Sequence, residues 1–233
     1  MRGVFVTGTD TGVGKTVIAG ALIAGFAEAG FDVAAYKPVA AGCAGPATAL
    51  RNDDAEVLSV LAGRKAPYER VNPVALEPAI APHIAAEEAG VRLSALDLAH
   101  AGATAASGAD VMVAEGAGGW LVPLGPGETM EDLAVGLGLP VVLVVGLRLG
   151  CLSHSLLTAR AIEASGLLLA GWVANILDAD MPRLDGNIAS LSERLAAPLL
   201  GRLPHLGQAT GADLCRAAFA HIDLQPLVSL LSK

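Results

Sequence analysis

The stretch FVTGTDTGVGKT, residues 5–16, limits most strongly what this chain can fold into. An apolar run enters a glycine-rich loop and a helix-favouring segment leaves it, which is the context of a phosphate-binding loop. The spacing departs from the usual G-x-x-x-x-G-K-[ST], because Gly8 lies one residue further from Gly14 than that pattern requires. The sequence therefore predicts an anion site at a strand-to-helix turn, with a lengthened loop.

Beyond this loop, short apolar runs alternate with longer amphipathic stretches. The predicted strands are 4–7, 33–36, 111–116, 141–146, 171–176 and 199–204, and the predicted helices are 16–29, 53–61, 94–106, 129–137, 152–165 and 183–196. Near-continuous apolar strands are typical of parallel sheets covered on both faces. We expect one α/β domain over residues 1–233, a doubly wound, mostly parallel sheet of the phosphate-loop NTPase type. Residues 67–82 are proline-rich and predict an irregular excursion, with one strand near Val74.

Composition excludes several classes of function. A net charge of −8 and 3% aromatic residues disfavour a nucleic-acid partner. The cysteines Cys43, Cys151 and Cys215 lack disulfide or zinc spacing, which indicates a reducing compartment. No signal-like segment opens the chain and no apolar run reaches the ~20 residues of a membrane span. We expect a cytoplasmic protein without a membrane partner.

The loop residues have distinct predicted roles. The N–H groups of Gly12, Val13 and Gly14, with the dipole of the following helix, would hold phosphate oxygens. Lys15 would neutralise phosphate charge, and the hydroxyl of Thr16 would bind Mg²⁺. The loop thus predicts an enzyme that uses a nucleoside triphosphate and Mg²⁺.

Ligands of doubly wound sheets bind at the carboxyl ends of the strands. Glu115 ends a strand there, and the GAGG segment 116–119 lets a ligand approach the backbone closely. With Thr16 and one of Asp53 and Asp54, it would give Mg²⁺ a shell of hard oxygen ligands.

Two further polar residues stand at strand ends, each with two interpretations. Lys37 is either a solvated strand end or a second cation that faces the phosphates. Asn175 is either a turn residue or a partner for the edge of a nucleotide base.

Taken together, the motifs resemble the dethiobiotin synthetase family. They are GTDTGVGKT (8–16), YKPVAAG (36–42), RNDDA (51–55), PHIAAE (82–87), VAEGAGGWLVPL (113–124), PVVLVVGLRLGCLSH (140–154), GWVAN (171–175) and LLGRLPHL (199–206). The resemblance implies a reaction in which ATP, CO₂ or bicarbonate, and 7,8-diaminononanoate give dethiobiotin, ADP and phosphate. One amine of the diamine would trap CO₂ as a carbamate, which would be phosphorylated and then closed to the ureido ring.

The resemblance also assigns roles to residues. Catalysis would use Thr11, Lys15 and Lys37, and Mg²⁺ would be held by Thr16, Asp54 and Glu115. The nucleotide would contact Gly12, Val13, Gly14, Lys15, Thr16, Val17, Asp54, Glu115, Gly116, Ala117, Gly118, Asn175, Pro204, His205 and Leu206. The diamine would contact Thr11, Lys37, Ala41, Gly118, Gly150, Cys151, Leu152 and Ser153. Because the family contributes the helix after Gly150 from a second subunit, we expect a homodimer with a shared substrate site.

Some positions depart from the family pattern. Ala41 stands where Ser or Thr is usual, Ser153 stands where Asn is common, and Asn187 falls in a region where some members offer a Tyr to the substrate carboxylate. These departures leave the reaction unchanged and bear on substrate affinity.

The main alternative is a partitioning-type ATPase, a dimerising molecular switch. Such proteins carry a signature lysine in the loop pattern K-G-G-x-G-K-T. Alignment on Gly14 and Lys15 places Asp10 at the signature position, and a carboxylate cannot act there as a cation. The sequence therefore favours the synthetase.

Overall fold

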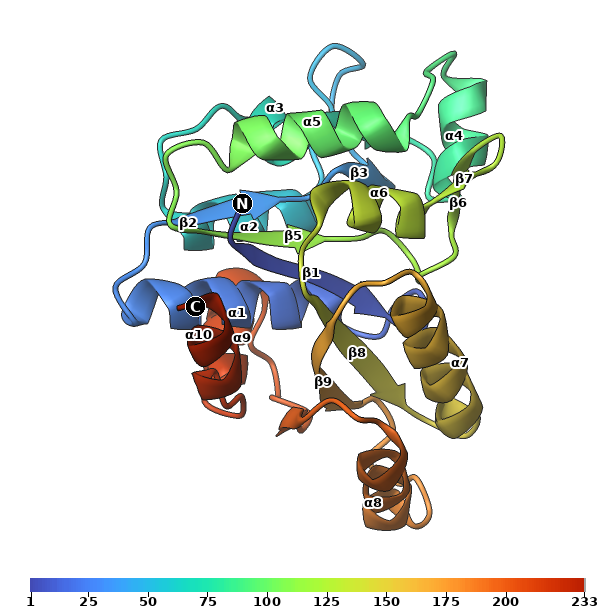
Figure 1. Ribbon diagram of the computed structural model, residues 1–233. Helices are drawn as coiled ribbons and strands as arrows, with labels where there is room; N and C mark the ends of the chain where they lie inside the picture. The colour runs from blue at the N-terminus through green and yellow to red at the C-terminus, as the bar shows by residue number, and fades with distance from the viewer. Residues whose placement is uncertain (233) are drawn as a thin grey trace.

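The computed structural model describes residues 1–232. Its central six-stranded sheet has the order β10–β9–β8–β1–β5–β2, and each neighbouring pair is parallel (Figure 1). These strands are β1 (Gly3–Gly8), β2 (Val33–Tyr36), β5 (Val111–Glu115), β8 (Val141–Leu147), β9 (Leu169–Ile176) and β10 (Leu199–Leu203). Two small sheets pair β3 (Val39–Ala41) with β4 (Val74–Leu76), and β6 (Pro123–Gly125) with β7 (Glu128–Thr129).

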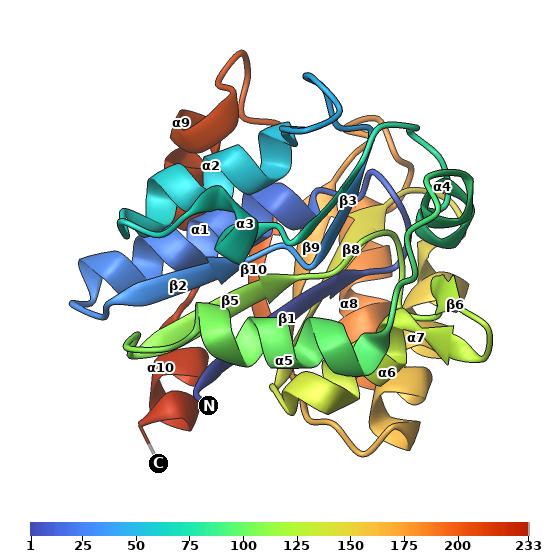
Figure 2. The same ribbon diagram turned by 90° about the horizontal axis from the view of Figure 1, so that it is seen from above.

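Helices cover both faces of the central sheet (Figures 1 and 2). One apolar layer holds α1 (Lys15–Glu28), α2 (Asp53–Ala62), α9 (Gly211–Phe219) and α10 (Gln225–Leu231). The other holds α5 (Ala95–Ala105), α6 (Met130–Leu137), α7 (Cys151–Ala164) and α8 (Leu184–Arg194). The short helices α3 (Tyr68–Val71) and α4 (Pro82–Glu88) lie in the excursion between β2 and β5. The predicted doubly wound α/β architecture is confirmed.

The two layers follow from the alternation of side chains along each strand. In β1, Val4 and Val6 face the α1 layer, whereas Phe5 faces the α5 layer. Because β1 is buried on both faces, the strand is apolar from Val4 to Val6, and its polar side chain, Thr7, is buried as well.

Close packing of α9 on α1 depends on two glycines in α1. A Cβ at Gly20 would lie 2.5 Å from Cys215 Sγ, and one at Gly25 would lie 2.3 Å from the ring of Phe219. These contacts give the two helix positions a packing role that the sequence did not predict, since α9 itself was not predicted.

The predicted strands and helices agree with the structure to within one or two residues at most ends. Ser94 is the expected N-cap of α5, because its Oγ accepts a hydrogen bond from Asp97 N–H at 3.3 Å. The strand near Val74 is β4, but the excursion over 67–82 is more regular than expected, since it also holds α3 and ends at Pro82, the first residue of α4. The sequence did not predict α3, α4, α9, α10, β3 or the small sheet of β6 and β7.

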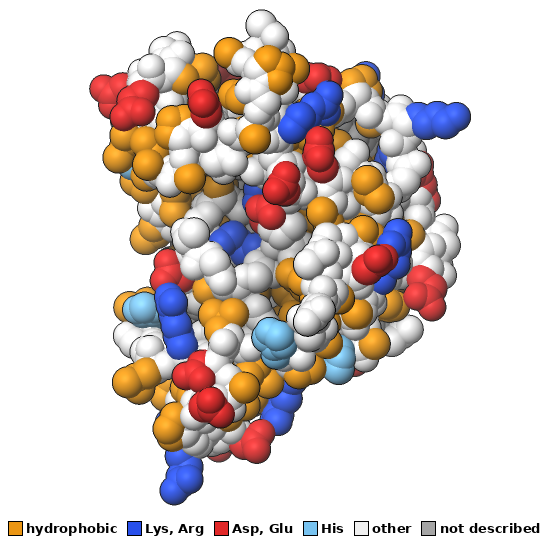
Figure 3. Space-filling model, turned by 180° about the vertical axis from the view of Figure 1, so that it is seen from behind, with side chains coloured by type: hydrophobic (Ala, Val, Ile, Leu, Met, Phe, Trp, Pro, Cys, Tyr) orange, Lys and Arg blue, Asp and Glu red, His pale blue; other side chains and the backbone are white. Residues whose placement is uncertain are grey.

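The surface in Figure 3 shows basic and acidic side chains scattered among apolar ones, without a continuous basic band on that face. Within residues 1–232, no helix combines the length and apolar character needed to cross a bilayer.

Candidate active site

The strand register gathers the predicted site residues at one edge of the sheet. In the β2–β5 pair Tyr36 lies opposite Ala114, so Lys37 and Glu115 are the next residues of neighbouring strands. Glu115 also lies opposite Val6 of β1, shortly before the phosphate loop begins. The loop, the lysine and the glutamate therefore converge at the carboxyl edge, as expected for this fold.

Gly14 closes the phosphate loop in a conformation that only glycine adopts easily. Its φ is 89°, and a Cβ there would lie 2.3 Å from Asn175 Nδ2. Asn175, near the end of β9, donates that Nδ2 hydrogen to the carbonyl of Val13 at 2.8 Å. Asn175 therefore lies in a strand rather than a turn, and its amide holds the loop in place, a role that the sequence did not predict.

Asp10 ties the loop to β8 as well. Its Oδ1 accepts the N–H of Thr11 at 2.7 Å, and its Oδ2 forms an ion pair with Arg148, the residue after β8. The carbonyl of Asp10 accepts a hydrogen bond from Lys15 Nζ at 3.0 Å. Arg148 was not among the predicted site residues, and it lies 138 residues from its partner in the chain.

Lys37, Glu115, Asp54 and Thr16 form one cluster beside the loop. Lys37 Nζ pairs with Glu115 Oε1 and lies 3.4 Å from Asp54 Oδ2. Thr16 Oγ1 donates to the same Glu115 oxygen at 2.9 Å. Lys37 is 5% exposed, which excludes the interpretation of a solvated strand end. Glu115 is also buried, and among the described residues its Oε2 has no hydrogen-bond partner.

The two lysines differ in their electrostatics. Burial lowers the pKa of Lys15 to about 8, an effect that the nearby Glu115 carboxylate opposes only in part. Burial acts in the same direction on Lys37, but the carboxylates of Glu115 and Asp54 outweigh it and raise its pKa. Lys37 is therefore a permanent cation near neutral pH, whereas Lys15 loses its proton more readily.

A cleft of about 790 Å³ opens over this cluster, a size that suits a small-molecule site. It brings together these predicted residues: Thr11, Gly12, Gly14, Lys15, Thr16, Val17, Lys37, Ala41, Asp54, Glu115, Ala117 and Gly118. Within the described chain, its wall does not include Val13, Gly116, Asn175, Pro204, His205, Leu206, Gly150, Cys151, Leu152 or Ser153.

The remaining predicted residues lie in two places. Pro204–Leu206 follow β10, whose Leu203 pairs with Asn175, so they share the carboxyl edge of the sheet with the loop. Gly150–Ser153 begin α7, beside Leu149, which is 96% exposed. Their roles in nucleotide and substrate binding stay predictions.

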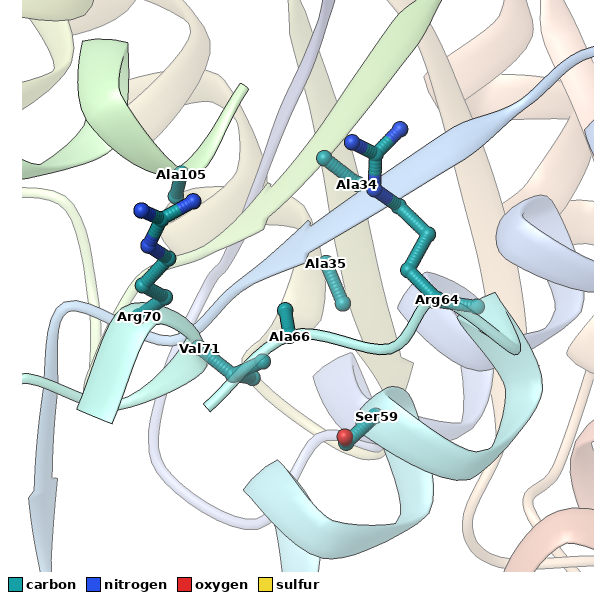
Figure 4. Close-up of a pocket in the computed structure, with 9 residues that line it drawn as sticks. Ala34, Ala35, Ser59, Arg64, Ala66, Arg70, Val71 and Ala105 are labelled. Carbon is teal, nitrogen blue, oxygen red and sulfur yellow. The ribbon is translucent and has the colours of Figure 1, made fainter. Parts of the chain in front are cut away.

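A second hollow lies between α2, α3 and β2. Figure 4 shows Arg64 and Arg70 on either side of it, with alanine side chains between them. Its volume is about 10 Å³, which holds about one water molecule. It is too small for a substrate, whereas the larger cleft beside the phosphate loop holds the predicted site residues and is the candidate active site.

Replacing Gly14 by Ala should weaken nucleotide binding by roughly tenfold or more. The new Cβ would collide with Asn175 Nδ2. The alanine would also have to adopt a left-handed backbone conformation, which alone costs about 1–2 kcal/mol. Calorimetric titration with Mg·ATP measures the loss. Gly12→Ala is the matched control, because Gly12 has a φ of 74° but nothing within 4 Å of its Cβ position. Equal affinities for the two variants would contradict the role given to the Gly14–Asn175 contact.

The strand order, the phosphate loop and the buried lysine–carboxylate cluster define a nucleotide-binding α/β protein of the phosphate-loop class. The fold is similar to that of the septum site-determining protein MinD, complexed with Mg-ADP, from Pyrococcus horikoshii, with a TM-score of 0.62 and 16% identity over 100% of this chain and 96% of that one. It is also similar to a ParA family ATPase from Chlorobium tepidum, with a TM-score of 0.58 and 15% identity over 100% and 98% of the two chains. At such identities the likeness concerns the fold alone.

Sequence comparison identifies the family. An AAA domain model, AAA_26, matches residues 2–213. The ATP-dependent dethiobiotin synthetase BioD of Pseudomonas paraeruginosa is 55% identical over 97% of this chain and 98% of its own. The enzyme of the same name from Ralstonia nicotianae is 46% identical over 97% and 96%. The chain belongs to the ATP-dependent dethiobiotin synthetase family, which confirms the resemblance found in the motifs.

Proposed function

We propose that this chain is an ATP-dependent dethiobiotin synthetase that converts 7,8-diaminononanoate and CO₂ to dethiobiotin in biotin biosynthesis. Beyond family membership, one observation supports it most. Lys15 and Lys37, both buried, line a single cleft together with Thr11 and the phosphate loop. Two cations beside one triphosphate suit a phosphoryl transfer to an anionic acceptor.

The proposed reaction needs no covalent enzyme intermediate. An amine nitrogen of the diamine attacks CO₂ and loses a proton, giving a carbamate. A carbamate oxygen attacks the γ-phosphorus, and the bond to ADP breaks. The neighbouring amine then attacks the carbonyl carbon, loses a proton and expels phosphate as the ring closes.

In this proposal the chain positions reactants and balances charge. Lys37, held at the cleft by two carboxylates, would contact the carbamate and the transferring phosphoryl group. Lys15 would exchange the carbonyl of Asp10 for phosphate oxygens. Thr11 would orient the carbamate, since its side chain lies close to Gly118 across the cleft. Ala41 lines the same cleft without a hydroxyl.

The residues present fit Mg²⁺. The unpartnered Glu115 Oε2, the Thr16 hydroxyl and the Asp54 carboxylate are hard oxygen ligands beside the loop. No group of three or more His, Cys, Asp or Glu side chains suited to a metal gathers within residues 1–232, so the phosphates would have to complete the shell. Bound there, the ion would supply charge neutralisation for the transferring phosphoryl group.

We also propose a homodimer with a substrate site shared between subunits. The start of α7 does not line the cleft of its own described chain, and Leu149 beside it is 96% exposed. A hollow of about 390 Å³ next to the loop is lined by Thr11, Leu121 and Leu157, among others. Leu121 and Leu157 are 60% and 63% exposed, which marks an apolar surface for a partner subunit.

Leu157→Glu should shift the protein from dimer to monomer in sedimentation and lower synthetase activity with it. The cause is the desolvation of a charge in an apolar interface. Val60→Glu is the matched control, because Val60 is also 63% exposed but lies on α2. A fully active monomer would refute the shared site.

A cytoplasmic location is part of the proposal, and three buried free thiols, Cys43, Cys151 and Cys215, support it. The rival ATPase switch is disfavoured, because Asp10 at the signature position is already paired with Arg148.

A coupled assay of ADP release with bicarbonate, run with and without 7,8-diaminononanoate, tests the function. We expect release to depend on the diamine and dethiobiotin to form in equal amount. ADP release that ignores the diamine would overturn the proposal.

A further inference from the structure

Lys37 lies where the chain leaves the central sheet, between the end of β2 and the start of β3. The hydrogen bonds between the strands of the central sheet therefore do not fix the backbone of Lys37. Its N–H donates to the carbonyl of Val71 at 2.7 Å, and its own carbonyl accepts Asn72 Nδ2 at 2.7 Å. Val71 and Asn72, at the end of α3, thus hold both the N–H and the carbonyl of Lys37.

Asn72 is 2% exposed, and its side chain makes further hydrogen bonds besides the one to Lys37. Its Nδ2 also donates to the carbonyl of Val74 at 3.1 Å, and its Oδ1 accepts the hydroxyl of Tyr68 at 3.1 Å. The same hydroxyl accepts the N–H of Asn52 at 2.8 Å. The guanidinium of Arg51 lies 4.1 Å from the centre of the Tyr68 ring, a cation–π contact that fixes the ring.

Asn52 is the N-cap of α2, since its Oδ1 accepts the N–H of Ala55 at 3.2 Å. The first turn of α2 carries Asp54, whose carboxylate lies 3.4 Å from Lys37 Nζ. The series Lys37–Asn72–Tyr68–Asn52 therefore begins at one site residue and ends beside another. Figure 2 shows α3 beside α2 and β2, and the hydrogen bonds of this series connect the ends of these three elements.

We propose that Asn72 and Tyr68 are positioning residues that fix Lys37 relative to Asp54 in the active site. Within the described chain neither residue lines the cleft, so both act through the backbone of other residues. A buried hydrogen-bond network of this kind is rigid only when each member is satisfied. Displacement of a reacting group by about 1 Å can cost about 10²-fold in rate.

The test compares three variants with a matched control. Tyr68→Phe deletes the hydroxyl, Asn72→Asp keeps the acceptor for Tyr68 but loses the donor to Lys37, and Asn72→Ala loses both. Tyr36→Phe is the control, because its buried hydroxyl donates to the carbonyl of Leu98 at 2.5 Å in the opposite layer. Circular dichroism and urea unfolding confirm that each variant is folded.

We expect kcat to fall about tenfold for Tyr68→Phe and roughly 10- to 100-fold for Asn72→Ala and Asn72→Asp. Affinity for metal-free ATP should change less than about threefold, because the phosphate loop is untouched, whereas KM for Mg·ATP should rise in step with the loss of metal affinity. The Tyr68→Phe, Asn72→Ala double variant should be no slower than Asn72→Ala, since one series is broken in both. Tyr36→Phe should keep its kcat.

A second readout needs no turnover. Affinity for Mn²⁺, measured by electron paramagnetic resonance with a non-hydrolysable ATP analogue, should fall about tenfold in Tyr68→Phe and stay unchanged in Tyr36→Phe.

The kinetic measurement rests on the proposed function. The Mn²⁺ measurement does not, so it distinguishes failure of the inference from failure of the proposed function. A wild-type enzyme without diamine-dependent ADP release would overturn the function alone, and the Mn²⁺ affinities would then decide the inference. An active wild type whose Tyr68 and Asn72 variants match Tyr36→Phe in kcat and Mn²⁺ affinity would overturn the inference alone. If Asn72→Ala does not fold, Tyr68→Phe decides in the same way.

Discussion

We expect Lys37→Met to lower kcat by roughly 10²- to 10³-fold, while the enzyme still binds Mg·ATP. The methionine keeps most of the side-chain volume but removes the cation that would stabilise charge on the transferring phosphoryl group. The substitution also leaves Glu115 buried without its main cation, a loss that costs about 3–5 kcal/mol in comparable buried pairs. Steady-state kinetics and urea unfolding measure the two effects separately.

The matched control is Lys65→Met, because Lys65 is exposed and does not line the cleft of the described chain. It should change neither turnover nor stability measurably. A Lys37→Met enzyme with near-normal kcat would remove Lys37 from the chemistry and leave it a structural partner of Glu115.

Glu115→Gln should raise the Mg²⁺ concentration needed for half-maximal activity by roughly 100-fold. Glutamine keeps the size of the side chain and an oxygen that can accept from Thr16, but it removes the negative charge. The unpartnered Oε2, which we assign to the metal, then belongs to a neutral amide. Magnesium titrations of activity, and calorimetric titrations of Mg²⁺ with a non-hydrolysable ATP analogue, measure the change.

Glu193→Gln serves as its control, since that carboxylate is exposed on α8. An unchanged Mg²⁺ requirement in Glu115→Gln would refute metal ligation and restrict Glu115 to the pairing with Lys37.

Most of the fold could be predicted because five of the six central strands are buried along nearly their whole length and are therefore mostly apolar in sequence. The helices α9 and α10 follow the last strand, where no further β/α alternation identifies them. The glycines of α1 also gain meaning only once α9 is placed against them.

Some contacts of the candidate site could likewise be predicted from the sequence, and others could not. Lys37 and Glu115 could be predicted as neighbours because parallel strands end at one edge. Asn175 contacts the loop across 162 residues, and Asp10 pairs with Arg148 across 138. Such contacts are set by tertiary packing rather than by any local period, so the sequence alone did not reveal them.

The charges of the lysine–carboxylate cluster determine which form of the nucleotide the cleft binds. The formal charges of Lys15 and Lys37 cancel those of Glu115 and Asp54, so the cluster presents no net attraction to a polyanion. Free ATP would bring its phosphates against two carboxylates, whereas a nucleotide that arrives with its cation exchanges one set of ion pairs for another. The enzyme should therefore take the preformed magnesium complex as its substrate and treat uncomplexed ATP as a weak competitor.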